Sequence, residues 1–212
     1  MEALILTLVT LTFVVLSVTP NACLERRAWA HRPPRRVLRT TSLCRLIIGE
    51  CTEISPDAYG WADTPGLRST EQVQGWRRVT DAVHKKGGFM YAQLWHTGAM
   101  SHPDFFEGAL PMSASAVNPE QESVTPSGRK PTVAPRPMSK AEIRQTGAEF
   151  GVTAKNALAA GFDGVQIQAN YLYLIDQFLN SATNLRTDEY GGSCIRTKGV
   201  PRLSRVVNGA VN

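Results

Sequence analysis

Strand-like and helix-like patterns alternate along the middle of this 212-residue chain, and this alternation constrains its fold more than any other feature. Short apolar runs have the composition of buried parallel strands, and the segments between them repeat apolar residues at helical spacing. The predicted strands are 46–48, 89–95 and 164–168, and the predicted helices are 70–86, 140–160 and 173–179. Strands and helices that alternate at these spacings form parallel βαβ units, so the sequence predicts an α/β fold.

Two capping boxes mark where the longer helices begin. Ser69 is followed three residues later by Gln72, and Ser139 is followed in the same way by Glu142. In this arrangement each side chain accepts a hydrogen bond from the other residue's backbone N–H. The predicted buried faces are Val73, Trp76, Val79 and Val83 in the first helix and Ile143, Phe150, Ala154 and Leu158 in the second.

Two architectures accommodate parallel βαβ units, a doubly wound sheet and a (β/α)8 barrel. A doubly wound sheet that binds nucleotides carries a glycine-rich phosphate turn directly after a strand. Neither G-x-G-x-x-G nor G-x-x-x-x-G-K-[ST] occurs in this sequence, which favours the barrel. The chain is shorter than the roughly 250 residues of a typical complete barrel, so a partial barrel is expected. In a barrel the chemistry lies at the carboxyl ends of the strands, which here are residues 49–52, 93–96 and 168–173.

The segment from residue 96 to residue 138 has no clear period and contains seven prolines. Connections of this length without secondary structure are usually functional lids or disordered segments. We therefore expect a lid or an irregular loop here.

The leader at residues 1–22 contains sixteen consecutive uncharged residues, 3–18, and three interpretations of it stay open. The run suits the apolar region of a signal peptide, and it is shorter than the roughly 20 residues of a transmembrane helix. A short membrane anchor is the second interpretation. The third is that the segment replaces a proper domain start through gene rearrangement or a wrong gene model. The first two predict a secreted or membrane-anchored protein, so a membrane is a partner only if the leader is retained.

The basic charge is confined to one segment. Residues 24–45 hold seven arginines and one glutamate, a charge of +6, so the rest of the chain sums to −1 against the overall +5. Residues 23–38 are rich in arginine and proline and are predicted to be a linker. A nucleic-acid interface needs a basic face on a folded module, so no nucleic-acid partner is expected.

The cysteines lie far apart in the sequence and form neither a C-x-x-C pair nor a cluster with histidine. They are Cys23, Cys44, Cys51 and Cys194. Structural zinc sites use such clusters, so no metal site is expected.

Seven stretches of the sequence, in the same order, resemble the Old Yellow Enzyme family of FMN-dependent ene-reductases, which includes the plant 12-oxophytodienoate reductases. The matching stretches are residues 46–55, 64–66, 81–88, 93–98, 156–168, 173–179 and 184–193. The resemblance covers about 39–193 and implies a partial (β/α)8 barrel with about the second to the fourth or fifth βα unit. It leaves a non-family segment before the barrel and a divergent tail at 194–212. It also implies FMN at the carboxyl face of the barrel, NAD(P)H as the reductant of the flavin, and a location in the cytoplasm.

The resemblance assigns roles to four residues. Tyr173 matches the tyrosine that protonates the α-carbon of the substrate, and a phenol with an ordinary pKa of about 10 keeps its proton at neutral pH. Gln93 matches the glutamine that binds the flavin ring, and Cys51 falls where the family has alanine or glycine near the flavin. Trp61 aligns with an aromatic position over the substrate site.

Several positions depart from the family pattern, including Ala99, where many members have arginine, and residues 194–196, which replace the expected Glu-Asn-Arg. Gln168 and Tyr171 stand where the family has His-x-x-Asn or His-x-x-His, the pair that grips the carbonyl oxygen of the substrate. Both can donate hydrogen bonds to an oxyanion, but neither can carry the charge of an imidazolium. Leu172 replaces a glycine beside the proton donor, where its side chain is expected to crowd the loop.

Two functions follow from the resemblance and its departures. The first is an ene-reductase that uses FMN and NAD(P)H to reduce a small enone, an α,β-unsaturated carbonyl compound. The second is a truncated, non-catalytic remnant that can neither bind FMN nor complete the barrel, because the first strand and the later phosphate-binding strands have no counterpart. The oligomeric state stays open in both cases.

Overall fold

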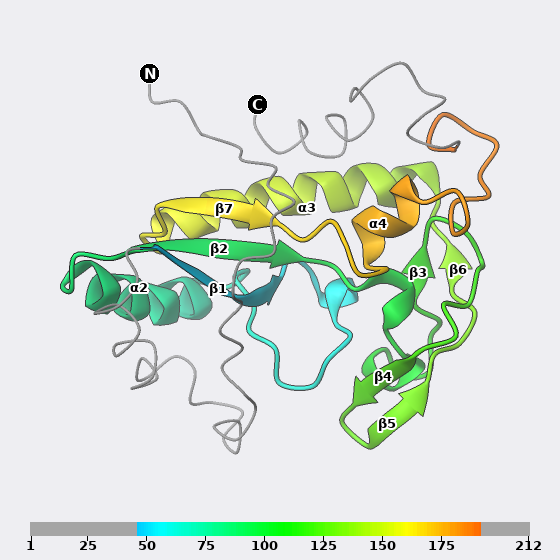
Figure 1. Ribbon diagram of the computed structural model, residues 1–212, viewed down its shortest axis with the longest axis horizontal. Helices are drawn as coiled ribbons and strands as arrows, with labels where there is room; N and C mark the ends of the chain where they lie inside the picture. Colours follow the sequence, from blue (N-terminus) through cyan, green and yellow to red (C-terminus); the bar gives the residue numbers. More distant parts are fainter. Residues whose placement is uncertain (1–45, 192–212) are drawn as a thin grey trace. The chain divides into compact units, whose positions relative to one another are not determined.

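The computed structural model describes residues 46–191 (Figure 1). They form two compact units: the first holds residues 46–53, 63–94 and 153–167, and the second holds residues 54–62, 95–152 and 168–191. The expected leader at 1–22, linker at 23–38 and tail at 194–212 lie outside the described residues.

A three-stranded sheet forms the centre of the first unit. Its strands are β1 (Leu46–Glu53), β2 (Phe89–Trp95) and β7 (Gly164–Ile167), in the order β1-β2-β7. β2 and β7 pair in parallel, with Tyr91 opposite Gly164, and the arrowheads of all three strands point the same way in Figure 1. These are the three predicted strands. β1 is longer than expected, so residues 49–52 are part of the strand and do not follow it.

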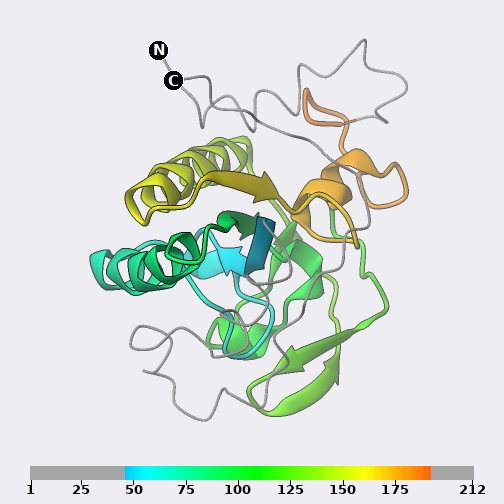
Figure 2. The same cartoon turned by 60° about the vertical axis from the view of Figure 1, so that its left-hand side comes forward.

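The helices that connect these strands are α2 (Thr70–His84) and α3 (Lys140–Ala159). Arg77 donates to the carbonyl of Ala159 over 2.9 Å, and Thr80 Oγ1 donates to the carbonyl of Ala160 over 2.7 Å, so α2 packs beside the carboxyl-terminal end of α3. In Figure 2, α2 and the last turns of α3 lie on the same side of the three strands. A doubly wound sheet carries helices on both faces, so this one-sided covering agrees with a barrel.

α2 begins where its sequence predicts. The Ser69 side chain accepts from the Gln72 N–H over 3.2 Å, and the Gln72 side chain accepts from the Ser69 N–H over 3.0 Å. The predicted apolar face is buried at Trp76, Val79 and Val83. The Trp76 ring packs 5.2 Å from the ring of Phe162. The chain turns after α2 at Gly87, whose φ of 72° lies in the left-handed region that glycine enters without a steric penalty.

α3 also begins at its predicted capping box, since Ser139 N–H donates to Glu142 over 2.7 Å and Glu142 N–H donates to Ser139 Oγ over 3.2 Å. Its predicted apolar stripe is correct at Ile143 and Phe150, which are both buried. It is wrong at Leu158, which is 48% exposed, whereas the neighbouring residue Ala157 is fully buried. Ala157 lies seven residues, about two helical turns, after Phe150 and therefore on the same face of the helix. The side chain of the following residue, Leu158, is rotated by about 100° from that face.

The second unit contains regular structure that the sequence did not predict between residues 96 and 138. This region holds two 3-10 helices, η4 (Gly98–Met100) and η5 (Pro103–Phe105), and four short strands, β3 (Met112–Ser113), β4 (Glu122–Thr125), β5 (Gly128–Pro131) and β6 (Arg136–Pro137). Elsewhere in the unit are the 3-10 helix η3 (Pro56–Ala58) and α4 (Leu174–Leu179), which is the helix predicted at 173–179. β4 and β5 form an antiparallel hairpin, and β3 pairs with β6 in parallel. The expectation of an irregular loop is therefore wrong, while the alternative of a functional lid stays a prediction. The strands are too short to give a sequence period, and prolines close β5 and β6.

A small apolar core holds the second unit together. Met112, Met138, Ile143 and Leu174 form a buried cluster, and Phe178 and Tyr190 pack against it. Arg186 stabilises the loop beside this core, because its guanidinium pairs with Asp188 over 2.6 Å and donates to the carbonyls of Ala114 and Met138. Glu189 pairs with Lys140 over 2.6 Å. Both acidic residues of this loop thus make ion pairs that stabilise it.

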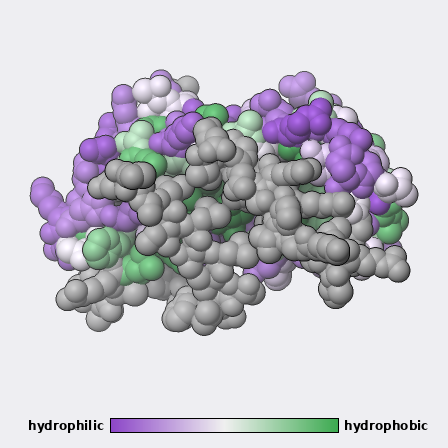
Figure 3. All heavy atoms as spheres, turned by 90° about the horizontal axis from the view of Figure 1, so that it is seen from above, coloured by the Kyte–Doolittle hydropathy of each residue, from purple (hydrophilic) through white to green (hydrophobic). Residues whose placement is uncertain are grey.

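Apolar surface among the described residues is scattered. Figure 3 shows hydrophilic residues over much of the visible described surface, with smaller apolar areas between them. Exposed large apolar side chains occur in both units, for example Phe89 in the first and Leu185 in the second. Within residues 46–191, no helix has the length and apolar character needed to cross a membrane.

Candidate active site

A row of hydrogen-bonded side chains crosses the sheet of the first unit. Gln93 on β2 stands opposite Gln166 on β7 in the parallel register, so the two side chains lie on the same face. Gln93 Nε2 donates to Gln166 Oε1 over 2.6 Å, and the Cys51 thiol on β1 donates to Gln93 Oε1 over 2.7 Å. The row thus brings together Cys51 and Gln93, the two residues predicted to contact the cofactor.

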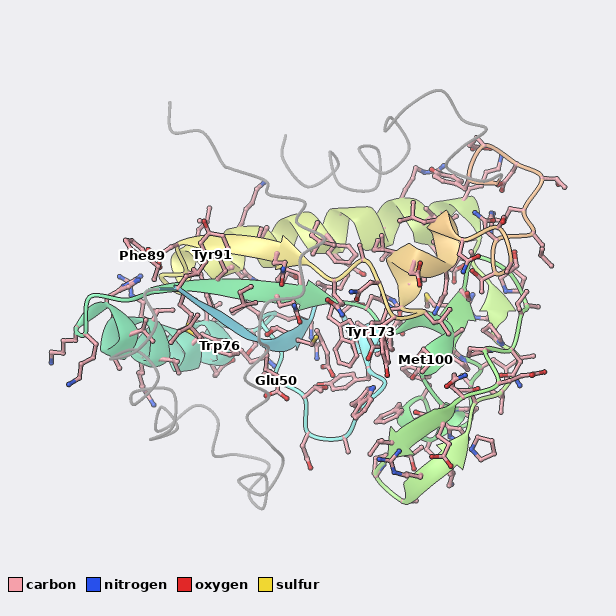
Figure 4. All side chains as sticks on the ribbon, in the orientation of Figure 1. Glu50, Trp76, Phe89, Tyr91, Met100 and Tyr173 are labelled. Atoms are coloured by element: carbon pink, nitrogen blue, oxygen red, sulfur yellow. The ribbon has the colours of Figure 1, made fainter. Side chains whose placement is uncertain are left out.

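The environment of Cys51 keeps its thiol neutral. Burial, with a smaller contribution from the negative charge of Glu50, raises the pKa of the Cys51 thiol to about 12. Burial also raises the pKa of Glu50, which lies on the same strand (Figure 4). A thiol with so high a pKa donates a hydrogen bond at neutral pH and is a poor nucleophile. The structure therefore favours a packing and hydrogen-bonding role for Cys51.

Tyr173, the predicted proton donor, belongs to the second unit and occupies the N-cap position directly before α4 (Figure 4). Its side chain is largely buried, with 7% of its surface exposed. The ring packs edge to face against Trp95, with 5.1 Å between ring centroids and an angle of 82° between the planes. The Tyr171 ring is also close, with its centroid 5.9 Å from that of Tyr173. The ring of Tyr173 thus packs against two other aromatic rings, those of Trp95 and Tyr171.

The turn before Tyr173 has an unusual backbone. Tyr171 and Leu172 have φ values of 62° and 59°, in the left-handed region that a residue with a Cβ rarely enters. Leu172 N–H donates to Asp176 Oδ2 over 2.8 Å, and the Leu172 carbonyl accepts from Gln177. The departure from glycine at Leu172 therefore strains the backbone of the turn, and side-chain contacts from α4 hold the turn in place.

The other predicted substrate-binding residues have different surroundings. Gln168 follows the end of β7 and donates to Asn170 Oδ1 over 2.9 Å. Tyr171 is 73% exposed, so its hydroxyl is accessible to a ligand. Trp61 lies beside the β4–β5 hairpin, where it forms an isolated parallel bridge with Val124. The structure therefore brings Tyr171 to Tyr173, and it places Trp61 against β4.

Three polar residues that take part in these arrangements were not predicted as site residues. Gln166 is identified by its register with Gln93, and its only signal in the sequence is a polar residue inside an apolar strand. His96 directly follows β2, is 2% exposed and accepts from the Gly98 N–H through Nδ1 over 3.1 Å. Burial lowers the pKa of His96 to about 3, so its ring is neutral at physiological pH. Gln177 lies inside the second unit and contacts several segments that are distant in sequence.

The donor set of the first unit fits a flavin ring better than it fits a metal. The pyrimidine edge of an isoalloxazine ring carries one N–H donor between two carbonyl acceptors, and side-chain amides such as those of Gln93 and Gln166 offer both complementary functions. Divalent metals prefer carboxylate, imidazole or thiolate ligands. Within residues 46–191, no three His, Cys, Asp or Glu residues gather in a way that could hold a metal ion.

Comparison with known proteins identifies the family. The model of the NADH:flavin oxidoreductase / NADH oxidase family matches residues 19–197. The flavin oxidoreductase hxnT of Emericella nidulans is 43% identical over 148 residues, which are 70% of this chain and 38% of that protein. The 12-oxophytodienoate reductase 1 of Oryza sativa subsp. japonica is 40% identical over 149 residues, again 70% of this chain and 38% of that protein.

Solved structures share the fold. The Old Yellow Enzyme homologue from Zymomonas mobilis is 37% identical, with a TM-score of 0.75, and the match covers 88% of this chain and 52% of that chain. Morphinone reductase is 34% identical, with a TM-score of 0.73, over 84% of this chain and 50% of that chain. This chain therefore spans 38% of the length of the two curated relatives and about half of the two solved chains.

These matches confirm both the resemblance to Old Yellow Enzymes and the α/β fold class, part of a (β/α)8 barrel. The family match extends over most of the chain and includes the polar row of the first unit and the aromatic cluster around Tyr173. The chain belongs to the NADH:flavin oxidoreductase / NADH oxidase family.

Proposed function

We propose that this chain acts as an FMN-dependent ene-reductase, in which NAD(P)H supplies electrons and a small α,β-unsaturated carbonyl compound accepts them. The observation that carries the proposal is the amide pair of Gln93 and Gln166, joined over 2.6 Å across β2 and β7. Gln93 is only 6% exposed, and after its bonds to Gln166 and Cys51 its amide keeps one N–H and one lone pair that need hydrogen-bonding partners. A flavin edge supplies such partners, and the chain belongs to a family named for flavin chemistry.

The first-unit residues have binding roles in this proposal. Gln93 and Gln166 hold one edge of the flavin ring through their amide groups. Cys51 donates to Gln93 Oε1 and so orients the Gln93 amide with its Nε2 toward Gln166. When bound, FMN takes up hydride from NAD(P)H and passes it to the β-carbon of the alkene.

Tyr173 has the chemical role. Its phenol delivers a proton to the α-carbon as the alkene is reduced, and Tyr173 then regains a proton from solvent. The rings of Trp95 and Tyr171 hold the phenol in a mainly apolar environment, which restricts the competing access of water. Tyr171 and Gln168 bind the carbonyl oxygen of the substrate through a hydroxyl and an amide N–H, both of them neutral donors.

The departures at these two positions favour a second candidate, a non-catalytic member of the family. A neutral donor stabilises a developing oxyanion less than an imidazolium does. The left-handed backbone at Tyr171 and Leu172 adds a further change to the same turn. In this alternative the fold is retained and the carbonyl oxygen is held too weakly for reduction.

Flavin binding and two half-reactions separate these candidates. The full chain is titrated with FMN, and the flavin absorbance spectrum is followed first with NADPH or NADH and then with 2-cyclohexenone. The proposal predicts a bound flavin that is bleached by the nicotinamide and reoxidised by the enone. A chain that folds and binds no flavin refutes the proposal, and a chain that binds FMN but fails to reduce the enone supports the non-catalytic alternative.

Substitution of the proton donor tests the role of Tyr173. Tyr173→Phe is expected to slow reoxidation by the enone at least tenfold and to leave flavin reduction by the nicotinamide within about twofold of wild type. Tyr190→Phe is the matched control, because Tyr190 packs against the apolar core of the second unit. Equal losses in both half-reactions of Tyr173→Phe would exclude the proton-donor role.

A further inference from the structure

The side chain of Gln177 uses its full hydrogen-bonding capacity inside the second unit. It is 1% exposed and lies on α4. Its Oε1 accepts from Ala99 N–H over 3.1 Å and from Ser113 Oγ over 2.8 Å. Its Nε2 donates to the carbonyl of Thr97 over 3.2 Å and to the carbonyl of Leu172. One side chain thus joins α4 to η4, to β3 and to the turn before Tyr173.

Only glutamine fits this arrangement chemically. A primary amide has two N–H donors and two lone pairs, and all four are in use here. Glutamate would place a charged oxygen against the two carbonyl groups that now accept hydrogen bonds from Nε2. Methionine has a similar size and would leave all four partners without their bonds. Asparagine is one methylene shorter, so it would not reach the same partners from the helix.

Gly98 provides the space for this amide. Its φ of 60° lies in the left-handed region, and a Cβ at this position would overlap Gln177 Oε1. The backbone of η4 can therefore approach the amide closely only because residue 98 is glycine.

Gln177 contacts the backbone on both sides of the Tyr173 peptide. Its side chain binds the carbonyl of Leu172, and its own N–H donates to the carbonyl of Tyr173 over 2.9 Å. The next residue, Leu174, donates its N–H to the carbonyl of His96 over 3.0 Å. The backbone around Tyr173 is thus held by the hydrogen bonds from Gln177 and by the bond to His96, the residue after Trp95.

The same amide also holds the segment that carries the partner ring of Tyr173. Trp95, which packs edge to face against Tyr173 at 5.1 Å, lies two residues before Thr97. Gln177 binds the Thr97 carbonyl and the Ala99 N–H. It therefore ties the segment of Trp95 to the turn of Tyr173.

We infer that Gln177 is a positioning residue that sets the orientation of the Tyr173 phenol relative to Trp95 through these four hydrogen bonds. The part of the inference that concerns proton delivery rests on the proposed function. The part that concerns the position of the phenol is independent of it, because every contact lies within the second unit.

The test uses the full chain as wild type, Gln177→Met and Ser113→Ala, with Gln145→Met as control. Gln145 lies on the exposed face of α3 and donates to Glu149, so the control makes the same substitution away from Tyr173. Tyrosine rings are labelled with ¹³C, and the Tyr173 resonance is assigned from its loss in Tyr173→Phe. Amide hydrogen exchange is measured at Ala99. Where flavin binds, both half-reactions are also timed.

The inference predicts that Gln177→Met shifts or broadens the Tyr173 ring resonance and leaves that of Tyr91 in place. Exchange at the Ala99 amide should rise about tenfold or more, because its acceptor is lost. Ser113→Ala removes one of the four bonds and should move the Tyr173 resonance in the same direction by less, while Gln145→Met leaves it unchanged. With flavin bound, the enone half-reaction should slow in Gln177→Met, and flavin reduction should not.

Several results would overturn the inference. An unchanged Tyr173 resonance in a folded Gln177→Met protein would show that the phenol is positioned without the amide. Equal changes at Tyr91 and Tyr173 would show a general loss of structure. If Gln177→Met does not fold, the inference is tested with Ser113→Ala alone. An unshifted Tyr173 resonance in that variant contradicts the inference. These spectra need no flavin, so the positioning role of Gln177 stands or falls separately from the proposed function.

Discussion

The amide of Gln93 donates to Oε1 of Gln166 over 2.6 Å, directly across the parallel pair of β2 and β7. Strand register alone produces this contact, because residues opposite each other in a sheet point to the same face. Gln93 lies on the central strand of this sheet and is buried, and a buried polar side chain is expensive unless its remaining groups are satisfied. This pair is the structural reason to expect a polar planar ligand at this position.

The thiol of Cys51 should be protected from alkylation and should make stability fall at high pH. Its pKa is raised from 9.0 to about 12 in the folded chain, so between these values the unfolded chain releases a proton that the folded chain keeps. Stability is therefore fully present below about pH 9 and is lost as the pH rises toward 12. Urea unfolding of wild type and Cys51→Ala at pH 8 and pH 10 should show a steeper loss for wild type. An equal loss in both proteins, or rapid alkylation of folded Cys51 at pH 8, would contradict a buried neutral thiol.

His96 should make the chain sensitive to acid. Its pKa falls from 6.5 to about 3 on folding, so its contribution is fully present above about pH 6.5 and is lost as the pH falls toward 3. By pH 4.5, two pH units below the ordinary pKa, the loss should be about 2 to 3 kcal/mol. Urea unfolding at pH 7.5 and pH 4.5 should show this loss in wild type and a smaller one in His96→Gln. Identical pH dependence in the two proteins would show that His96 can accept a proton in the fold.

Leu172→Gly should relieve strain in the turn before Tyr173. A left-handed conformation costs a residue with a Cβ about 1 to 2 kcal/mol, and this exceeds the entropy that glycine adds to the unfolded chain. We expect a free energy of unfolding equal to that of wild type or up to about 1 kcal/mol higher. Leu110→Gly is the matched control, because Leu110 is 49% exposed and is not among the residues with positive φ. It should lose about 0.5 to 1 kcal/mol, and the same loss at both positions would show that the Leu172 backbone is not strained.

Local signals in the sequence were sufficient for the main elements of the fold. The capping boxes at Ser69 and Ser139 predicted where α2 and α3 begin, because the bonds concerned join residues three apart. The strand at Phe89–Trp95 has the predicted bounds, because Gly87 and Gly88 end the preceding helix and polar residues follow the short apolar run. The absence of a phosphate-turn motif favoured a barrel over a doubly wound sheet, and the family resemblance then supported the same choice.

Long-range contacts explain most of what the sequence could not predict. Leu158 satisfies a helical spacing and still points outward, because the buried face follows the seven-residue spacing of Phe150 and Ala157. The four partners of Gln177 come from segments up to 80 residues away, and no local pattern encodes their convergence. The burial of His96 could not be predicted locally, because it depends on contacts with distant segments such as Leu174, whose N–H donates to the His96 carbonyl.

The departure at Leu172 shows the converse case, in which sequence reasoning found the right position. Replacement of a glycine was expected to crowd the loop, and the structure places the effect in the backbone, with φ of 59° at Leu172 and 62° at Tyr171. The family pattern identified the position, and only the dihedral angles revealed the physical form of the change.

An FMN titration of wild type, Gln93→Met and Gln74→Met, followed by quenching of flavin fluorescence, tests the central claim most directly. Gln74 is exposed on α2, so the control makes the same substitution away from the sheet. Loss of the buried amide contacts should weaken FMN binding by Gln93→Met about tenfold or more, while Gln74→Met binds like wild type. Equal affinity of Gln93→Met and wild type, or a folded wild-type chain that binds no FMN, would contradict the assignment of Gln93 and Gln166 to the flavin.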